Sequence, residues 1–219
     1  MSERSPILLV VSAPSGAGKT TLCNYLVKDH GGLVYTISHT TRAPRRGETD
    51  GREYHFVDHP TFAAMREAGE FLEWAEVHGN LYGTARASVL DALAAGNDVL
   101  VDVDIQGAAS LRGDPQLQPI TVLVLPPSMA VLEERLRARA QDSDEVIARR
   151  MKSAVEEIKA ADAFDYWVVN GDLQVAHTAL ESILIVRSGR GGDYAARDLE
   201  VQLRRGPARR QLIRDTFRV

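Results

Sequence analysis

The sequence has little cysteine and no long apolar run. Cys23 is the single cysteine, which excludes an internal disulfide bond and suits a reducing compartment. Near the N-terminus only "ILLVV" at 7–11 is continuously apolar, and it is too short for a secretion signal or a membrane span. We therefore expect a cytoplasmic protein that does not bind membranes.

An excess of basic charge is also absent. The chain has 26 lysines and arginines against 30 aspartates and glutamates, for a formal net charge of -4. Proteins that bind nucleic acid through general electrostatics carry a broad basic field, so we expect no nucleic-acid partner. Lysine is scarce, with four lysines against 22 arginines. Because the composition favours arginine throughout, a cluster of arginines is weaker evidence for an anion site than it would be in an average chain.

Short apolar runs alternate with amphipathic segments, which is the pattern of a parallel sheet wrapped by helices. With 219 residues, 44% of them apolar, the chain can form one core that carries an inserted lobe. The runs that read as strands buried on both faces are 7–11, 98–103, 120–125 and 166–170. The predicted helices are 19–29, 85–95, 128–139 and 143–161, with a short one after residues 58–60.

Three segments depart from this alternation. Residues 38–84 are rich in turn formers, histidine and aromatics, which predicts an inserted lobe. The stretch "RARAQDSDE" at 137–145 is polar and charged, as in a mobile flap. From Arg187 the pattern weakens, because "RSGRGG" at 187–192 does not favour a helix. The sequence leaves open whether the arginine-rich tail is flexible or mediates self-association.

A glycine-rich loop directly follows the first predicted strand and opens a helix. It fits the phosphate-loop pattern G-x-x-x-x-G-K-[ST] except for Ala13 at the leading glycine. Glycines allow the sharp turn that aims backbone N–H groups at an anion, and the helix N-terminus adds its positive end. Lys19 would reach the β- and γ-phosphates of a nucleotide, and the Thr20 hydroxyl would bind Mg²⁺. An ordinary turn with an exposed lysine is the alternative. The loop residues are Ala13, Pro14, Ser15, Gly16, Ala17, Gly18, Lys19 and Thr20.

A second candidate anion site is the segment "SHTTRAPRRGE" at 38–48. Pro44 and Gly47 bend the backbone, so that Arg42 and Arg45 can converge. A guanidinium binds phosphate through paired N–H donors, which lysine does not have. Arg46 reads as surface, and a solvated surface cluster is the alternative for the whole segment.

The same lobe carries groups suited to a guanine nucleotide. The hydroxyls of Tyr54 and Tyr82 can join the two arginines around a phosphate dianion. The Glu73 carboxylate accepts two hydrogen bonds at once, matching N1–H and the exocyclic amine of guanine, a donor pair that adenine lacks. The Ser38 and Thr84 hydroxyls can donate to guanine O6. Each residue alone also reads as packing or capping, but their combination beside a phosphate loop favours a guanine site.

Two carboxylates lie at the end of the strand predicted at 98–103, where ligands bind in α/β folds. Buried carboxylates need a partner, and Mg²⁺, Lys19 or the guanine edge would each serve. We assign Asp102 to the guanine nucleotide and Asp104 to the metal shell.

These motifs together resemble the guanylate kinase family, nucleoside monophosphate kinases that convert ATP and GMP to ADP and GDP. The resemblance spans roughly residues 6–187. It rests on "SAPSGAGKT", "SHTTRAPRRGE", "FLEWAEVHGNLYGT", "VDVDIQGA", "LPPS" and "RLRARAQDSDEVIARRM". It implies an α/β fold of the P-loop NTPase type, a parallel sheet flanked by helices with an inserted nucleotide-monophosphate-binding lobe and a lid. ATP is then the co-substrate, with Mg²⁺.

The resemblance also implies roles for individual residues. The ATP site takes the 13–20 loop, with Asn170 near the adenine. The lid arginines close over the transferring phosphoryl group, where Lys19 and Arg42 also act. The lid arginines are Arg135, Arg139 and Arg150. The implied GMP site is Ser38, Arg42, Arg45, Tyr54, Glu73, Tyr82, Thr84 and Asp102.

The implied division of the chain follows the same elements. The core takes 1–37, 85–136 and 152–187, the GMP lobe 38–84, the lid 137–151 and the basic tail 188–219. Ala140 and Gly171 depart from the family pattern, in the lid and near the adenine respectively. Use of dGMP and homo-oligomer formation stay open.

Two other functions fit parts of the same pattern. One is a catalytically inactive guanylate-kinase-like module that binds phosphoproteins, which would need neither phosphate loop nor lid arginines. The other is a related phosphokinase acting on a sugar phosphate, which would have no use for Glu73.

Overall fold

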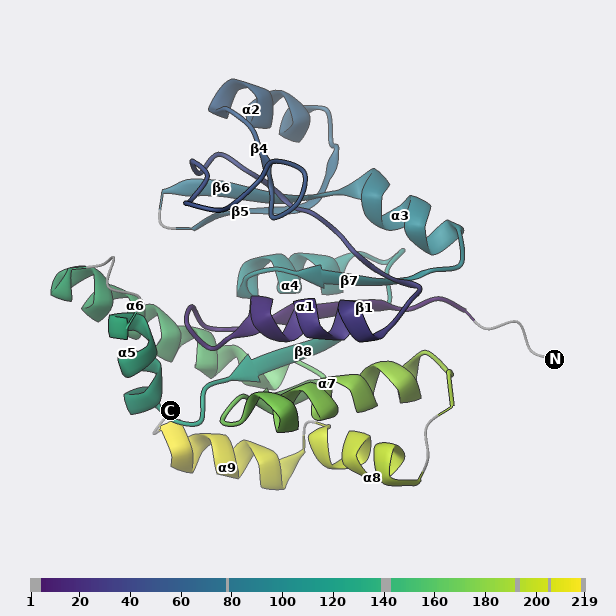
Figure 1. Ribbon diagram of the computed structural model, residues 1–219, viewed down its shortest axis with the longest axis vertical. Coiled ribbons are helices and arrows are strands. Elements are labelled where there is room, and N and C mark those ends of the chain that lie inside the picture. The colour runs from purple at the N-terminus through teal and green to yellow at the C-terminus, as the bar shows by residue number, and fades with distance from the viewer. Residues whose placement is uncertain (1–4, 78, 139–142, 192–193, 205, 218–219) are drawn as a thin grey trace.

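The computed structural model describes residues 5–77, 79–138, 143–191, 194–204 and 206–217, and its centre is a parallel sheet of five strands (Figure 1). The strand order is β2-β7-β1-β8-β9. The strands are β1 (Leu8–Ser12), β2 (Leu33–Tyr35), β7 (Asp98–Asp102), β8 (Ile120–Leu125) and β9 (Tyr166–Val169). The predicted α/β fold class is confirmed.

Alternating side chains of the central strands divide the core between the two faces of the sheet. Leu9 and Val11 pack on one face with helices α1, α7 and α8. Leu8 and Val10 pack on the other with α3, α4, α6 and α9. The helices are α1 (Lys19–Asp29), α3 (Arg86–Ala94), α4 (Ile105–Gly113), α6 (Asp144–Lys159), α7 (Leu173–Arg187), α8 (Tyr194–Leu203) and α9 (Pro207–Phe217). Both faces are covered, which explains why these strands read as continuous apolar runs.

A second sheet lies above the β2–β7 side of the first, with helix α2 (His59–Glu67) on top of it (Figure 1). Its strand order is β4-β3-β6-β5, and Phe62 of α2 stacks on Phe71 with ring centroids 4.5 Å apart. The strands are β3 (His39–Thr40), β4 (His55–Phe56), β5 (Phe71–Val77) and β6 (Asn80–Ala85). The sequence pattern predicted only the helix, because two strands are two residues long and a glutamate interrupts the apolar face of β5.

Helices α5 (Met129–Ala138) and α6 form a hairpin with its own small core. Leu132 and Leu136 of α5 pack against Ile147 and Ala154 of α6. A short 3₁₀ helix (Ala160–Ala163) follows α6. The predicted lid residues Arg139 and Ala140 fall between the two helices, outside the described residues.

The C-terminal tail folds against the core as helices α8 and α9, which lie along the lower edge of the molecule in Figure 1. Arg204 forms an isolated antiparallel bridge with Tyr166, so the tail covers the outer edge of β9. Leu203 is buried with α7, and Ile213 and Phe217 are buried near Trp167. In the described ranges, none of the helices is both long and apolar enough to cross a bilayer.

Candidate active site

The loop between β1 and α1 has the backbone of an anion cradle. Gly16 and Gly18 have φ angles of 96° and 94°, a left-handed conformation that favours glycine. The Ala17 N–H donates to the Pro14 carbonyl over 3.0 Å, which closes the turn. Helix α1 then begins at Lys19, so the N–H groups of its first turn and its positive end belong to the same loop.

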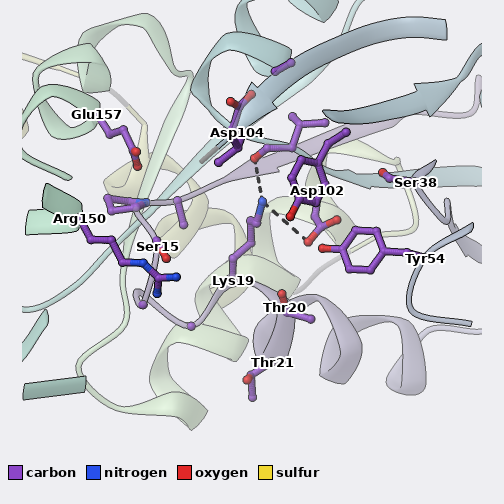
Figure 2. Close-up of a pocket in the computed structure, with 18 of the residues that line it drawn as sticks. Ser15, Lys19, Thr20, Thr21, Ser38, Tyr54, Asp102, Asp104, Arg150 and Glu157 are labelled. Carbon is purple, nitrogen blue, oxygen red and sulfur yellow. Dashed lines mark hydrogen bonds and ion pairs between the residues drawn. The ribbon is translucent and has the colours of Figure 1, made fainter. Parts of the chain in front are cut away.

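The Lys19 side chain points toward the carboxyl end of β7 (Figure 2). Its Nζ donates to the Val103 carbonyl oxygen over 2.7 Å and lies 3.8 Å from Asp102 Oδ2. The ammonium is therefore held where strands β1 and β7 both end, above the phosphate loop.

One cavity of about 270 Å³ joins the phosphate loop to the second sheet. Its walls come from the loop and the start of α1, from β5 and β6, from the end of β7, and from α6. Ser38, just before β3, and Arg45 and Tyr54, between β3 and β4, complete them. The predicted site residues in its wall are Ala13, Pro14, Ser15, Gly16, Gly18, Lys19, Thr20, Ser38, Arg45, Tyr54, Glu73, Tyr82, Asp102, Asp104 and Arg150. The structure thus brings together residues that are scattered over most of the chain.

Glu48 holds the arginine segment in place through hydrogen bonds to Arg42 and Arg45. Arg42 Nη2 donates to Glu48 Oε1 over 2.9 Å, and the Arg45 N–H donates to Glu48 Oε2 over 2.7 Å. The Arg42 guanidinium also lies over the rings of Tyr54 and Phe56, 5.3 and 5.7 Å from their centroids. Although partial burial opposes it, the hydrogen bond and charge of Glu48 raise the pKa of Arg42. Arg42 therefore stands beside the cavity wall, whereas Arg45 is part of it.

Glu73 is a buried carboxylate on β5, 7% exposed. The register between β5 and β6 shifts between Phe71 and Glu73, and such bulges re-aim side chains. Thr84, opposite on β6, donates its hydroxyl to Glu73 Oε1 over 2.5 Å. Burial raises the pKa of Glu73 to about 7, against the Thr84 hydrogen bond, which lowers it.

The two aspartates at the end of β7 differ in their surroundings. Asp102 faces Lys19. Burial raises the pKa of Tyr54 to about 12, and the negative charge of Asp102 adds to this shift. The same two causes raise the pKa of Tyr35. Asp104 is the N-cap of α4, where its Oδ1 accepts a hydrogen bond of 2.8 Å from the Gly107 N–H. Both carboxylates belong to the cavity wall.

Helix α6 contributes two charged residues to the cavity, Arg150 and Glu157 (Figure 2). Burial and the nearby charge of Asp104 raise the pKa of Glu157 to about 7, and Lys19 opposes this shift. Sequence reasoning missed Glu157. Its signal is the spacing of seven residues from Arg150, which places both side chains on one face of a helix.

Of the described site residues, Thr84 and Asn170 lie behind the cavity wall, as does Arg135. The Asn170 amide, 5% exposed, donates over 2.8 Å to the Ala17 carbonyl of the phosphate loop. Arg135 Nη2 donates over 3.0 Å to the Asn170 carbonyl. These contacts support the loop from the β9 side.

Known proteins similar to this chain are guanylate kinases. The guanylate kinase family model matches residues 5–186. A guanylate kinase of Rhodopseudomonas palustris (strain HaA2) is 55% identical over 182 residues, 83% of each chain. A guanylate kinase of strain BisB18 is 50% identical over 208 residues, 93% of this chain and 95% of the relative.

A solved structure extends the comparison to three dimensions. The crystal structure of guanylate kinase from Anaplasma phagocytophilum superposes with a TM-score of 0.73 at 33% identity, covering 86% of this chain and 89% of that one. The chain belongs to the guanylate kinase family.

Proposed function

We propose that the cavity transfers the γ-phosphoryl group of ATP to GMP, giving ADP and GDP. The observation that carries this proposal is a single cavity with a phosphate loop at one end and a buried guanine-matching carboxylate, Glu73, at the other. The family relationship supports the same activity. An inactive protein-binding module would need neither the loop nor Lys19, and a sugar phosphate has no base edge for Glu73 to bind.

At the donor end, the backbone N–H groups of the loop would hold the ATP phosphates, and Lys19 would neutralise charge on the β- and γ-phosphates. Asn170 would act from behind by fixing the Ala17 carbonyl, which keeps the loop in its binding conformation. We assign the adenine to the neighbourhood of Asn170.

Thr20, in the first turn of α1, and Asp104, at the start of α4, fit Mg²⁺, because a hydroxyl and a carboxylate are the hard oxygen ligands that this ion prefers. Thr20 and Asp104 both line the cavity and would hold it. When bound, the ion supplies charge neutralisation and orientation of the phosphates.

At the acceptor end, Arg42, Arg45, Tyr54 and Tyr82 would bind the GMP phosphate. Glu48 fixes the arginine segment in advance, so little conformational entropy is lost when the phosphate arrives. A phosphate dianion needs no general base to act as nucleophile, so the work of the protein is positioning and charge stabilisation.

The base of GMP would be read by Glu73, assisted by Ser38 and Asp102. We assign Thr84 to this reading through Glu73, since its hydroxyl donates to the carboxylate. Ionised Glu73 accepts from guanine N1–H and the exocyclic amine, and neither donor is present at the matching edge of adenine.

Closure would complete the site. We infer that the lobe at 38–84 and the lid at 137–151 move toward the core, bringing Arg135, Arg139 and Arg150 over the transferring group. Exclusion of water then strengthens these charge interactions and prevents hydrolysis of ATP. We place the activity in the cytoplasm, where both nucleotides are available.

The test is an assay of ADP release with ATP and Mg²⁺ against GMP, AMP, CMP, UMP and a ribose bisphosphate as acceptors. We expect rapid ADP release when GMP is the acceptor and not with the other acceptors. Equal release with AMP, or release with the sugar phosphate and not with GMP, would overturn the assignment.

A further inference from the structure

Gly107 lies in the first turn of α4, directly beside the buried carboxylate of Glu73. A Cβ atom built on Gly107 would lie 2.5 Å from Glu73 Oε2 and 3.0 Å from Glu73 Cδ. Ordinary van der Waals contact begins at 3.4 Å, which is about 0.9 Å more than the 2.5 Å between the built Cβ and Oε2. A methyl group here would therefore displace the carboxylate by about 0.9 Å. The second sheet and the central core therefore meet at this point, where the Glu73 carboxylate of β5 lies against the Gly107 backbone of α4.

The backbone conformation of Gly107 does not itself call for glycine. Its φ angle lies outside the left-handed region, unlike those of Gly16 and Gly18. Glycine inside a helix is less stable than alanine. The missing side chain is thus explained by the space it leaves, and Glu73 fills that space.

The Glu73 carboxylate is located from two sides. Thr84 fixes Oε1 by a hydrogen bond of 2.5 Å, and the bare Gly107 backbone limits the position of Oε2. The Gly107 N–H donates to Asp104 Oδ1, so this amide is not available to Glu73. The first turn of α4 therefore acts on the Glu73 carboxylate through its shape and through the positive end of the helix. A carboxylate held in this way presents both oxygens to the cavity in one orientation.

We propose that Gly107 is a specificity-determining residue of the acceptor site, since it sets the position from which Glu73 reads guanine. This inference rests on the proposed function. Glu73 must meet two donors on one edge of the base, so an error of about 0.9 Å affects both hydrogen bonds together. Gly107 itself touches Glu73 and is a positioning residue.

The experiment substitutes Gly107→Ala and uses Gly113→Ala as a matched control on the same helix, where an added Cβ meets nothing within 4 Å. Because a misplacement of about 1 Å can lower a rate by about 10²-fold, we expect kcat/KM for GMP to fall by about that factor. The KM for ATP stays unchanged. Gly113→Ala keeps wild-type kinetics.

A second readout separates positioning from general damage. IMP has N1–H but lacks the exocyclic amine of guanine, so the ratio of kcat/KM for GMP to that for IMP measures the reading by Glu73. We expect Gly107→Ala to lower this ratio toward that of Glu73→Ala. An unchanged ratio would overturn the inference.

The neighbouring Val103 supplies the rival explanation, because its Cβ lies 3.0 Å from the built Cβ and its carbonyl holds Lys19. If the methyl group displaces Val103 instead, the KM for ATP rises and the GMP-to-IMP ratio stays constant, which contradicts the inference. In the Glu73→Ala background, Gly107→Ala should cause no further loss with GMP. A full additive loss there would also contradict it.

Folding and the proposed function are checked separately. Circular dichroism and thermal unfolding of each variant establish that it folds. If the wild-type chain fails to use GMP, the proposed function fails. If the wild type uses GMP and Gly107→Ala uses it equally well, only the inference on Gly107 fails.

Discussion

Lys19 and Asp102 lie within 3.8 Å of each other, from Nζ to Oδ2, at the ends of two adjacent strands. Lys19 follows the loop after β1, and Asp102 is the last residue of β7. The Val103 carbonyl holds the same ammonium over 2.7 Å. The positive charge is therefore fixed in the cavity before any nucleotide arrives, so that little reorganisation is needed when phosphates bind.

Lys19→Met is expected to abolish most turnover. The substitution keeps the length of the side chain and removes its charge, so the developing charge on the transferring phosphoryl group loses one stabilising partner. Loss of one such group lowers kcat by about 10²–10³-fold. The measurement is steady-state ADP release at saturating ATP and GMP.

Lys28→Met is the matched control, because Lys28 is exposed in the last turn of the same helix. It should retain wild-type kcat. Phosphoryl transfer at the normal rate by Lys19→Met would remove the loop from the mechanism.

The affinity for GMP should depend on pH through Glu73. Only the ionised carboxylate accepts two hydrogen bonds, and burial raises its pKa to about 7. The KM for GMP is therefore expected to rise as the pH falls from 8 to 6, whereas the KM for ATP changes little by this route.

Glu73→Gln separates this dependence from that of the GMP phosphate, whose own second pKa is about 6. The variant should use GMP poorly, by about 10⁴-fold in kcat/KM, because its amide places a donor against a donor. Its remaining pH dependence belongs to the phosphate. A wild-type profile identical in shape to that of the variant would argue against Glu73 as the titrating group.

The parts of the site that sequence predicted are those whose chemistry lies in adjacent residues. The phosphate loop carries its turn, its lysine and its hydroxyl within eight positions, and the buried strand at 120–125 reads as one apolar run with the bounds found in the structure. In both cases local chemistry and final structure agree.

The remaining parts depend on contacts between distant segments. The position of Glu73 is set by Thr84 on a neighbouring strand and by Gly107 on a helix of the core, and no short pattern connects them. Glu157 was hidden among the charged residues of α6. The tail shows no clear apolar pattern in the sequence, because its few buried residues, such as Leu203 and Ile213, are separated by arginines.

Glu157 is expected to lower the stability of the unliganded protein at alkaline pH. Its pKa is about 7 in the folded protein against an ordinary value of 4.5, mainly because it is buried. A raised carboxyl pKa contributes stability that is fully present below about pH 4.5 and is lost as the pH rises through about 7. Glu157→Gln should therefore raise the Tm relative to wild type at pH 8.5, and by less at pH 5.5.

Glu156→Gln is the control for this experiment. Glu156 is the preceding residue, its side chain is 64% exposed, and it forms a surface ion pair with Lys159. Such pairs contribute about 0–1 kcal/mol, so its Tm difference should be small at both pH values. A Tm difference for Glu157→Gln that is the same at pH 5.5 and 8.5 would show that burial does not raise this pKa.

The C-terminal helices are expected to stabilise the fold through Glu200 without contributing to catalysis. Glu200 is 1% exposed and accepts hydrogen bonds from the Tyr166 hydroxyl and from Arg204 Nε. Glu200→Ala leaves the buried Tyr166 hydroxyl without this partner, which costs about 1–3 kcal/mol in the free energy of unfolding. Tyr166 opens β9, at the opposite end of the sheet from the cavity, so kcat should not change.

Denaturant unfolding of three further variants isolates this hydrogen bond. Asp198→Ala, at an exposed position of the same helix, should leave the free energy of unfolding nearly unchanged. Adding Tyr166→Phe to Glu200→Ala removes the hydroxyl that has lost its acceptor and should recover part of the lost stability, whereas Tyr166→Phe alone should not stabilise the protein. If the double variant is less stable than Glu200→Ala by the full effect of Tyr166→Phe alone, the two residues act independently, and the tail is held by apolar packing of residues such as Leu203 and Phe217.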